Sequence, residues 1–164
     1  MKWESTYSLT LAVLLLTACT AESLKDQLAR QEQTIENYIN RLIDKGSLQA
    51  DSVFFNNGVY RLVFISGTGN EATSGDSVIF HYRARNFNTD VPYDSTGLYP
   101  EKGILGVGHY INGLEKGFLG MKTNEKAEIL LTGEQAYGNM SVGILPPYTP
   151  VKFEILMLNV VKNN

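Results

Sequence analysis

The chain has 164 residues, 43% of them hydrophobic, which is enough for one packed domain with short extensions. A formal net charge of −3 disfavours nucleic acid as a partner, because that binding needs clustered lysine and arginine side chains facing phosphates. The one cysteine cannot form an internal disulfide, and His81 and His109 lie too far apart for a zinc-ligand motif. We therefore expect neither a metal nor another cofactor.

The first 18 residues have the features of a bacterial signal peptide. Lys2 precedes an apolar run over residues 9–16, which is too short for a permanent membrane span but suits the core of a secretory signal. The run ends in Leu-Thr-Ala-Cys at residues 16–19, which resembles a lipobox. We expect cleavage before Cys19, a lipid anchor on Cys19, and export to a bacterial membrane, preferentially the outer membrane facing the periplasm. The alternative is a plain secretory signal with an incidental cysteine.

A helix is predicted from Ser23 to about Lys45, since Ser23 and Asp26 resemble a capping box and apolar residues recur at helical spacing. About twenty residues at ~1.5 Å each would give a spacer of roughly 30 Å over residues 19–50. Its apolar stripe can pack on the following domain, form a homodimer seam or bind an assembly partner. Gln31 interrupts the heptad pattern, which favours packing or a partner protein. The stripe comprises Leu24, Leu28, Ile35, Tyr38, Ile39, Leu42 and Ile43.

Downstream of Gly58 the hydrophobic period changes to two, which predicts β-strands. The first strand, before the turn-forming residues 66–70, carries Tyr60, Leu62 and Phe64 on one face. A second strand follows Gly75, and its alternate residues, including His81, form a partly solvated face. Its apolar face carries Val78, Phe80, Tyr82 and Ala84.

One short helix is predicted between the strands. Asn112 and Glu115 form a second capping-box candidate that would open this helix. Strands resume at residues 126–132 and 151–161. These elements predict one α+β domain over residues 51–164, in which a curved antiparallel sheet wraps around the short helix. The inward side of the helix would carry Ile111, Leu114, Phe118 and Met121.

A series of short motifs follows the order of these elements. They are Gly-Asp-Ser-Val-Ile-Phe-His-Tyr at 75–82, Tyr-Asp-Ser-Thr at 93–96, Tyr-Ile-Asn-Gly-Leu-Glu-Lys-Gly at 110–117, Ala-Tyr-Gly at 136–138 and Ile-Leu-Pro-Pro at 144–147. Together they resemble the FKBP-type peptidyl-prolyl cis-trans isomerases, and ordered motifs are more specific than any single one. The resemblance implies an FKBP-like fold and an isomerase that acts on proline-containing polypeptides and assists the folding of exported proteins.

The resemblance also implies which residues form the proline pocket. Leu114 stands at the pocket floor, where the best-known members have tryptophan. The hydroxyl of Tyr137 and the backbone N–H of Ile111 would be hydrogen-bond donors. Catalytic roles are implied for Tyr82, Asp94, Tyr137 and Phe153, and substrate contacts for Tyr93, Ile111, Leu114, Ile144 and Leu145.

Isomerisation requires no proton transfer, so we expect Asp94 to act electrostatically and to accept a hydrogen bond from Tyr82. The chain departs from the family at Glu101 and Gly103, where aromatic residues usually precede the central segment. We expect this more open wall to weaken macrocycle binding and to alter the preference for the residue before proline.

A second function stays open, in which the domain is a non-catalytic binding subunit of a membrane-associated secretion or motility complex. With its lipobox and the helix before the domain, the chain resembles FKBP lipoproteins of Bacteroidota, where some relatives serve gliding motility or type IX secretion. This alternative rests on analogy of fold alone.

Overall fold

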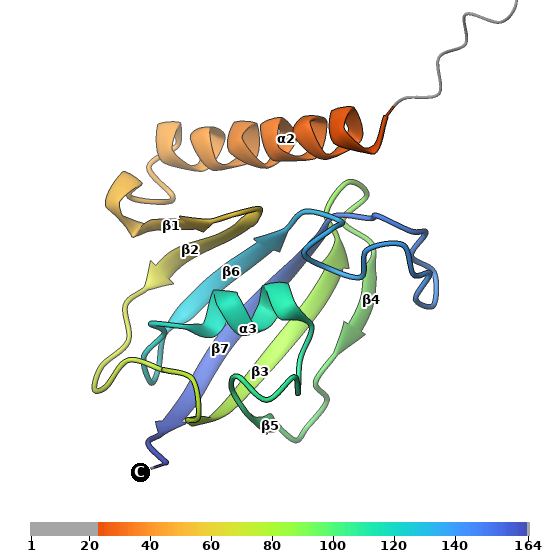
Figure 1. Cartoon of the computed structure of the whole chain (residues 1–164). Coiled ribbons are helices and arrows are strands. Elements are labelled where there is room, and N and C mark those ends of the chain that lie inside the picture. The colour runs from red at the N-terminus through yellow and green to blue at the C-terminus, as the bar shows by residue number, and fades with distance from the viewer. Residues whose placement is uncertain (1–22, 164) are drawn as a thin grey trace, which may run out of the picture.

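The computed structural model describes residues 23–163 (Figure 1). The predicted signal peptide at residues 1–18 and the predicted lipidation site Cys19 lie outside the described residues. Within residues 23–163, no helix has both the length and the apolar composition that a membrane span needs.

The centre of the fold is an antiparallel sheet of seven strands in the order β1-β2-β6-β7-β3-β4, with β5 pairing with β3 outside this path. The long strands β3 and β7 pair from Ser77 with Val161 to Asn86 with Val151. This arrangement confirms the predicted α+β class with an antiparallel sheet. The strands are β1 (Val53–Asn56), β2 (Val59–Ile65), β3 (Ser77–Asn86), β4 (Pro92–Ser95), β5 (Glu101–Ile104), β6 (Lys126–Leu131) and β7 (Val151–Val161).

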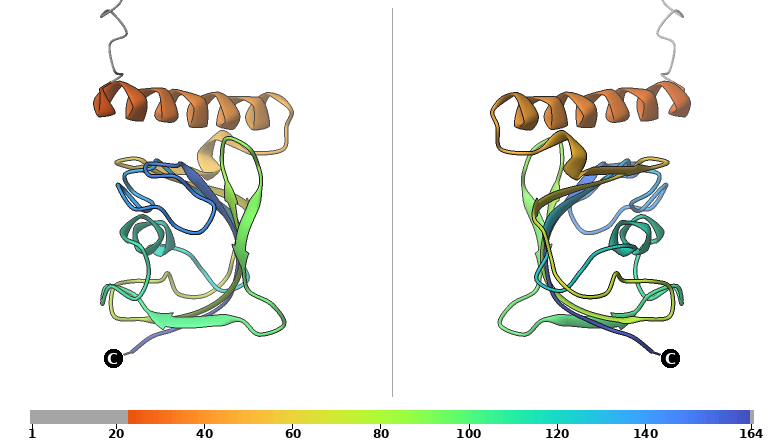
Figure 2. Two further views of the ribbon diagram at one scale, coloured as in Figure 1. Left: turned by 90° about the vertical axis from the view of Figure 1, so that its right-hand side faces the viewer. Right: turned by 90° about the vertical axis from the view of Figure 1, so that its left-hand side faces the viewer.

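The main core lies between the concave face of this sheet and the short helix α3 (Asn112–Phe118), around which the sheet curves (Figure 2). In the long strands β3 and β7, alternate residues lie in the core cluster with α3, as the period of two predicted. Phe118, Phe80 and Met157 are fully buried at the centre of this cluster. The hydrophobic contact of helix and sheet therefore fixes where the segment before α3 lies.

The long helix α2 (Leu24–Asp44) covers part of the outer face of the sheet (Figures 1 and 2). Ser23 caps it as predicted, since its hydroxyl accepts a hydrogen bond from the Asp26 N–H. Ile35 and Ile39 pack on the sheet, which is the first of the three arrangements open to the apolar stripe. The helix lies across the domain (Figure 1). The second cluster contains Ile35, Ile39, Leu48, Tyr60, Leu62 and Leu130.

Two local features differ from the sequence-based expectation. A hairpin of β1 and β2, preceded by the 3₁₀ turn η1 (Ala50–Ser52), was not predicted. Asn57 and Gly58 both have positive φ, at 44° and 78°, and an Asn-Gly pair is the usual signal for such a two-residue turn.

The expected capping box of α3 is wrong in its details. The N-cap residue is Ile111, which makes no side-chain capping bond, and Asn112 is already helical. The Glu115 carboxylate reaches further back and accepts a hydrogen bond from the His109 N–H at 3.0 Å. Glu115 therefore fixes the segment that enters the helix, and the Ile111 N–H remains outside this bonding.

Candidate active site

An aromatic cavity of about 340 Å³ opens between the concave sheet face and the start of α3. Side chains from β3, β4, β5, β7, α3 and the loop 132–150 meet there because the sheet curves around the short helix. The cavity is lined by Phe80, Tyr82, Asp94, Glu101, His109, Tyr110, Ile111, Leu114, Tyr137 and Phe153.

The apolar floor of this cavity is formed by Leu114 of α3 and Phe153 of β7, which are only 5% and 4% exposed. Tyr82 lies beside Phe153 on the same sheet face, with ring centroids 6.0 Å apart. These neighbours come from adjacent strands whose register places Tyr82 opposite Ile155, two residues from Phe153. The pairing of β3 and β7 therefore sets the relative position of wall and floor.

Tyr82 and Asp94 form the expected hydrogen bond, in which the phenol donates to the carboxylate at 2.7 Å. A bulge in β4 helps to aim these side chains. Ala84 pairs with Asp94 and Arg85 pairs with Pro92, which leaves Tyr93 as the extra residue. Because of the bulge, the consecutive residues Tyr93 and Asp94 both line a second hollow, which lies next to the aromatic cavity.

The remaining residues implied by the resemblance surround the cavity without lining it. Tyr93 packs edge-on against Tyr137 and Phe153, and its hydroxyl lies 3.3 Å from the Tyr137 hydroxyl. Tyr93 and Ile144 line an adjacent hollow of about 340 Å³, which shares Asp94 and Tyr137 with the aromatic cavity. Leu145 is buried in the main core at 2% exposure, below the surface that a ligand would contact.

The geometry agrees with the comparison with known families. The family model for the FKBP-type peptidyl-prolyl cis-trans isomerases matches residues 69–158, which is more than half of the chain. The chain belongs to this family. The match includes β3 to β6, α3 and most of β7, so it contains every side chain that lines the cavity.

Known FKBP proteins are similar over the same region. The FK506-binding protein of Neisseria meningitidis serogroup A is 34% identical over 97 residues, which cover 57% of this chain and 88% of that protein. FK506-binding protein 2A of Rhizopus delemar is 34% identical over 95 residues, or 56% of this chain, and the chain spans 57% of its length. The N-terminal domain of FKBP42 from Arabidopsis thaliana shares the fold, with a TM-score of 0.63, 22% identity, and coverage of 67% of this chain and 92% of that chain.

Three tyrosine hydroxyls of this FKBP site remain protonated far above neutral pH. Burial raises the pKa of Tyr82, and the hydrogen bond to Asp94 raises it further. Burial likewise raises the pKa of Tyr93 and Tyr137. Each hydroxyl therefore keeps a proton that it can donate.

The backbone N–H of Ile111 is a second available donor at the cavity. No residue in the described part of the chain accepts a hydrogen bond from it, although the carbonyl of Ile111 accepts from Leu114 and Glu115. Its position at the N-cap of α3 explains this, because the first N–H groups of a helix have no partner within the helix.

Sequence reasoning missed part of the cavity lining. The strand pattern predicts Phe80 on the inward face of β3, and the structure adds it to the cavity lining. Tyr110 and His109 also line the cavity, and their only sequence signal is position: Tyr110 is the first residue of the 110–117 motif, and His109 immediately precedes the motif. Glu101 was noted as a departure from the family and proves to be part of the wall.

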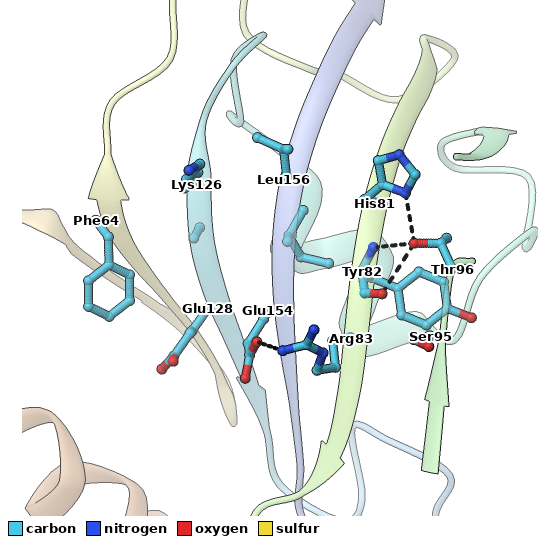
Figure 3. A pocket seen from close by; sticks show the side chains of 12 residues that line it. Phe64, His81, Tyr82, Arg83, Ser95, Thr96, Lys126, Glu128, Glu154 and Leu156 are labelled. Atoms are coloured by element: carbon cyan, nitrogen blue, oxygen red, sulfur yellow. Dashed lines mark hydrogen bonds and ion pairs between the residues drawn. The ribbon is translucent and has the colours of Figure 1, made fainter. Parts of the chain in front are cut away.

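A wider hollow of about 490 Å³ lies on the outer face of the sheet (Figure 3). His81 and Tyr82 are both joined to Thr96 there, and Arg83 pairs with Glu154 at 3.6 Å. Tyr82 contributes its backbone to this hollow, whereas its ring faces the aromatic cavity. The outer hollow is more open than the aromatic cavity and lacks its cluster of aromatic rings, so it is a poorer fit for a prolyl ring.

Proposed function

We propose that the chain catalyses cis-trans isomerisation of X–Pro bonds in proline-containing polypeptides. The observation that carries this proposal is the aromatic cavity with an apolar floor of Leu114 and Phe153 and the Tyr82–Asp94 pair at its wall. Membership of the isomerase family supports it independently.

The physical barrier to this reaction is the partial double bond of the amide, which costs ~18–20 kcal/mol to twist. No covalent bond is broken. Water hydrogen-bonds to the planar amide, so transfer of the prolyl ring into the apolar cavity removes solvation that favours the planar state. A millionfold acceleration would require about 8 kcal/mol of preferential binding to the twisted amide.

The polar groups of the cavity supply oriented interactions for the twisted amide. The Tyr137 hydroxyl and the Ile111 N–H donate hydrogen bonds to carbonyl oxygens of the bound peptide. Asp94 holds the Tyr82 ring in place and adds negative potential at one side of the cavity. No residue acts as a general acid or base, because no proton is transferred.

Rates of cis-to-trans conversion on a panel of X–Pro peptides test this function. Asp94→Asn should lower kcat/KM about tenfold with little change in thermal unfolding, which is less than the roughly hundredfold cost of removing a group that contacts the reacting atoms, because Asp94 acts through Tyr82. Asp51→Asn, the same change at an exposed carboxylate in η1, is the matched control and should leave kcat/KM unchanged.

Phe153→Ala should reduce kcat/KM more strongly than Asp94→Asn, because it removes half of the apolar floor. Wild-type rates equal to those of the uncatalysed reaction would overturn the enzymatic function. They would then favour a domain that binds polypeptides without catalysis.

We further propose that this isomerase assists the folding of exported proteins while anchored to a membrane through Cys19. The apolar run at residues 9–16 and the lipobox-like residues 16–19 support this location. Membrane sedimentation of the wild-type chain and of Cys19→Ala tests the anchor. Loss of sedimentation in Cys19→Ala is expected, and sedimentation of both chains alike would contradict it.

A further inference from the structure

Gln31 is the polar member of the buried face of α2. It lies one turn before Ile35 and two turns before Ile39, and these three residues are the buried ones of the helix. Ile35 and Ile39 pack on the sheet, whereas Gln31 reaches the loop 132–150 that connects β6 to β7. A buried amide costs free energy unless it is hydrogen-bonded, so its partners indicate its role.

Gln31 closes a ring of four hydrogen bonds with this loop. The Gly133 N–H donates to Gln31 Oε1 at 2.7 Å, and Gln31 Nε2 donates to the Tyr148 carbonyl at 2.8 Å. The Tyr148 N–H donates to the Gly138 carbonyl at 2.6 Å, and the Gly138 N–H donates to the Gly133 carbonyl at 2.8 Å. Each of the four residues thus donates once and accepts once.

The two ends of the loop touch inside this ring. An added Cβ on Gly133 would lie 2.1 Å from the Tyr148 carbonyl oxygen, so only glycine allows this approach. Within the described part of the chain, Gln31 is the hydrogen-bond partner of both the Gly133 N–H and the Tyr148 carbonyl. Without it, a buried donor and an acceptor would be left unpaired at the point where the loop closes.

The ring lies next to the aromatic cavity along the chain. Tyr137 immediately precedes Gly138, whose N–H and carbonyl are both members of the ring. The side chain of Tyr137 extends from this fixed backbone to the cavity, where its hydroxyl meets that of Tyr93. The position of the Tyr137 hydroxyl therefore depends on the closure of the loop.

We propose that Gln31 is a positioning residue for the active site, because it holds the loop that carries Tyr137. The packing of α2 on the sheet then influences the geometry of the cavity through this loop. The N-terminal helix therefore contributes to catalysis without contacting the substrate. The catalytic side of this inference rests on the proposed function, whereas the hold of Gln31 on the loop stands without it.

Gln31→Leu tests the inference, because leucine keeps the helix and the side-chain size but makes no hydrogen bond. We expect amide hydrogen exchange at Gly133, Gly138 and Tyr148 to accelerate about tenfold or more as the loop opens locally. We expect kcat/KM on an X–Pro peptide to fall roughly tenfold, a smaller loss than the about hundredfold that a misplacement of about 1 Å can cause. Gln33→Leu, the same change on the exposed face of α2, should alter neither quantity.

A double-mutant cycle with Tyr137→Phe separates positioning from general destabilisation. If Gln31 acts through the Tyr137 hydroxyl, Gln31→Leu should lower kcat/KM by less than about twofold in the Tyr137→Phe chain. Effects that multiply fully would overturn the inference, as would unchanged amide exchange in Gln31→Leu.

Gln31→Glu, which keeps the shape of the side chain, is a second variant should Gln31→Leu fail to fold. It keeps the acceptor for the Gly133 N–H and loses the donor to the Tyr148 carbonyl, so exchange should accelerate at Tyr148 more than in the Gln33→Leu control. Equal exchange in both would overturn the hold on the loop. A wild-type chain without isomerase activity would overturn the proposed function instead, and the exchange data would still decide the role of Gln31.

Discussion

The Tyr110 side chain fills the space next to Gly103, where an added Cβ would lie 2.3 Å from the Tyr110 hydroxyl oxygen. The ring of Tyr110 packs against Phe80 with centroids 5.5 Å apart and against Phe118 at 5.7 Å. Where the family usually has an aromatic residue on β5, this chain has Gly103, and Tyr110 from the neighbouring segment fills the space. The cavity wall is therefore more aromatic than the sequence of β5 alone indicates.

The contact of Gly103 with Tyr110 predicts a specific pattern of stability. Gly103→Ala should lower the free energy of unfolding by about 1–3 kcal/mol, because the added methyl group overpacks a filled core. In a Tyr110→Val chain, Gly103→Ala should cost less than it does in the wild type, because the ring that the added methyl group meets has been removed. Urea unfolding measures both effects. Gly97→Ala is the control because no atom lies within 4 Å of its added Cβ, and a loss as large as that of Gly103→Ala would contradict the explanation.

We expect Glu101 to give the cavity a preference for a positively charged residue before the proline. It lines the cavity together with the carboxylate of Asp94, and no residue in the range 23–163 forms an ion pair with Glu101. We expect peptides with Lys or Arg before the proline to be isomerised about fivefold faster than peptides with Glu there, which corresponds to about 1 kcal/mol for a partly exposed ion pair.

Values of kcat/KM at low and high salt measure this preference. Glu101→Gln should remove most of the difference between the peptides, and salt should weaken it in the wild type because salt screens exposed charges. Asp51→Asn should leave the difference intact. A preference that survives in Glu101→Gln would show that Glu101 is not its source.

We expect the buried side chain of Arg61 to contribute strongly to the free energy of unfolding. The residue is 7% exposed, and its Nη1 donates to the carbonyls of Gly117 and Leu119 at the C-terminal end of α3. Its Nε lies 3.7 Å from Glu125, and burial raises the pKa of Glu125. Arg61→Leu should lower the free energy of unfolding by about 3–5 kcal/mol, since it leaves Glu125 buried without its partner.

Arg61→Leu combined with Glu125→Leu should be more stable than Arg61→Leu alone, because the unpaired buried charge is gone. Urea unfolding of the wild type and the three variants gives the complete cycle. If the double variant is no more stable than Arg61→Leu, the loss comes from the carbonyl bonds at the end of α3 and not from the ion pair.

We expect the Asp76 carboxylate to stabilise the fold in a way that is lost in acid. A hydrogen bond from Lys162, together with those from Thr73, lowers its pKa from 3.8 to about 2. A carboxyl group with a lowered folded-state pKa stabilises the fold above its unfolded value, and this contribution is lost as the pH falls from about 4 to 2. Asp76→Asn should therefore lower stability by about 1–2 kcal/mol at pH 7, after allowance for the partly exposed Lys162.

Urea unfolding from pH 2 to pH 7 measures this component. The difference between wild type and Asp76→Asn should shrink as the pH falls through this window. A difference that is constant with pH would contradict the assignment of the stability to the ionised carboxylate.

The repeating patterns of the sequence were sufficient for most of the elements. Period-two alternation placed Tyr82 and Phe153 on inward strand faces, and helical spacing with a Ser23 cap defined α2. Such patterns work because side chains alternate at fixed angles along a helix or strand. The β1–β2 hairpin was also within reach of the sequence, since Asn57-Gly58 is a recognised turn signal.

The candidate site depended on contacts that no local pattern encodes. Tyr110 lies in the connection between β5 and α3, seven residues after Gly103, and this connection folds back so that the Tyr110 ring lies against Gly103. The placement of Ile144 and Leu145 was equally non-local: the packing of the loop leaves Ile144 in the adjacent hollow and Leu145 in the core.

The sequence by itself determined the family, the α+β class and the order of the elements, because ordered motifs and hydrophobic periods are local properties of the chain. The tertiary structure decided what Gln31 does. In the sequence Gln31 is an interruption of an apolar stripe, and in the fold it joins Gly133 to Tyr148, residues more than a hundred positions away. Hydrogen bonds of this kind depend on where two distant backbones meet, and only the packed chain specifies that place.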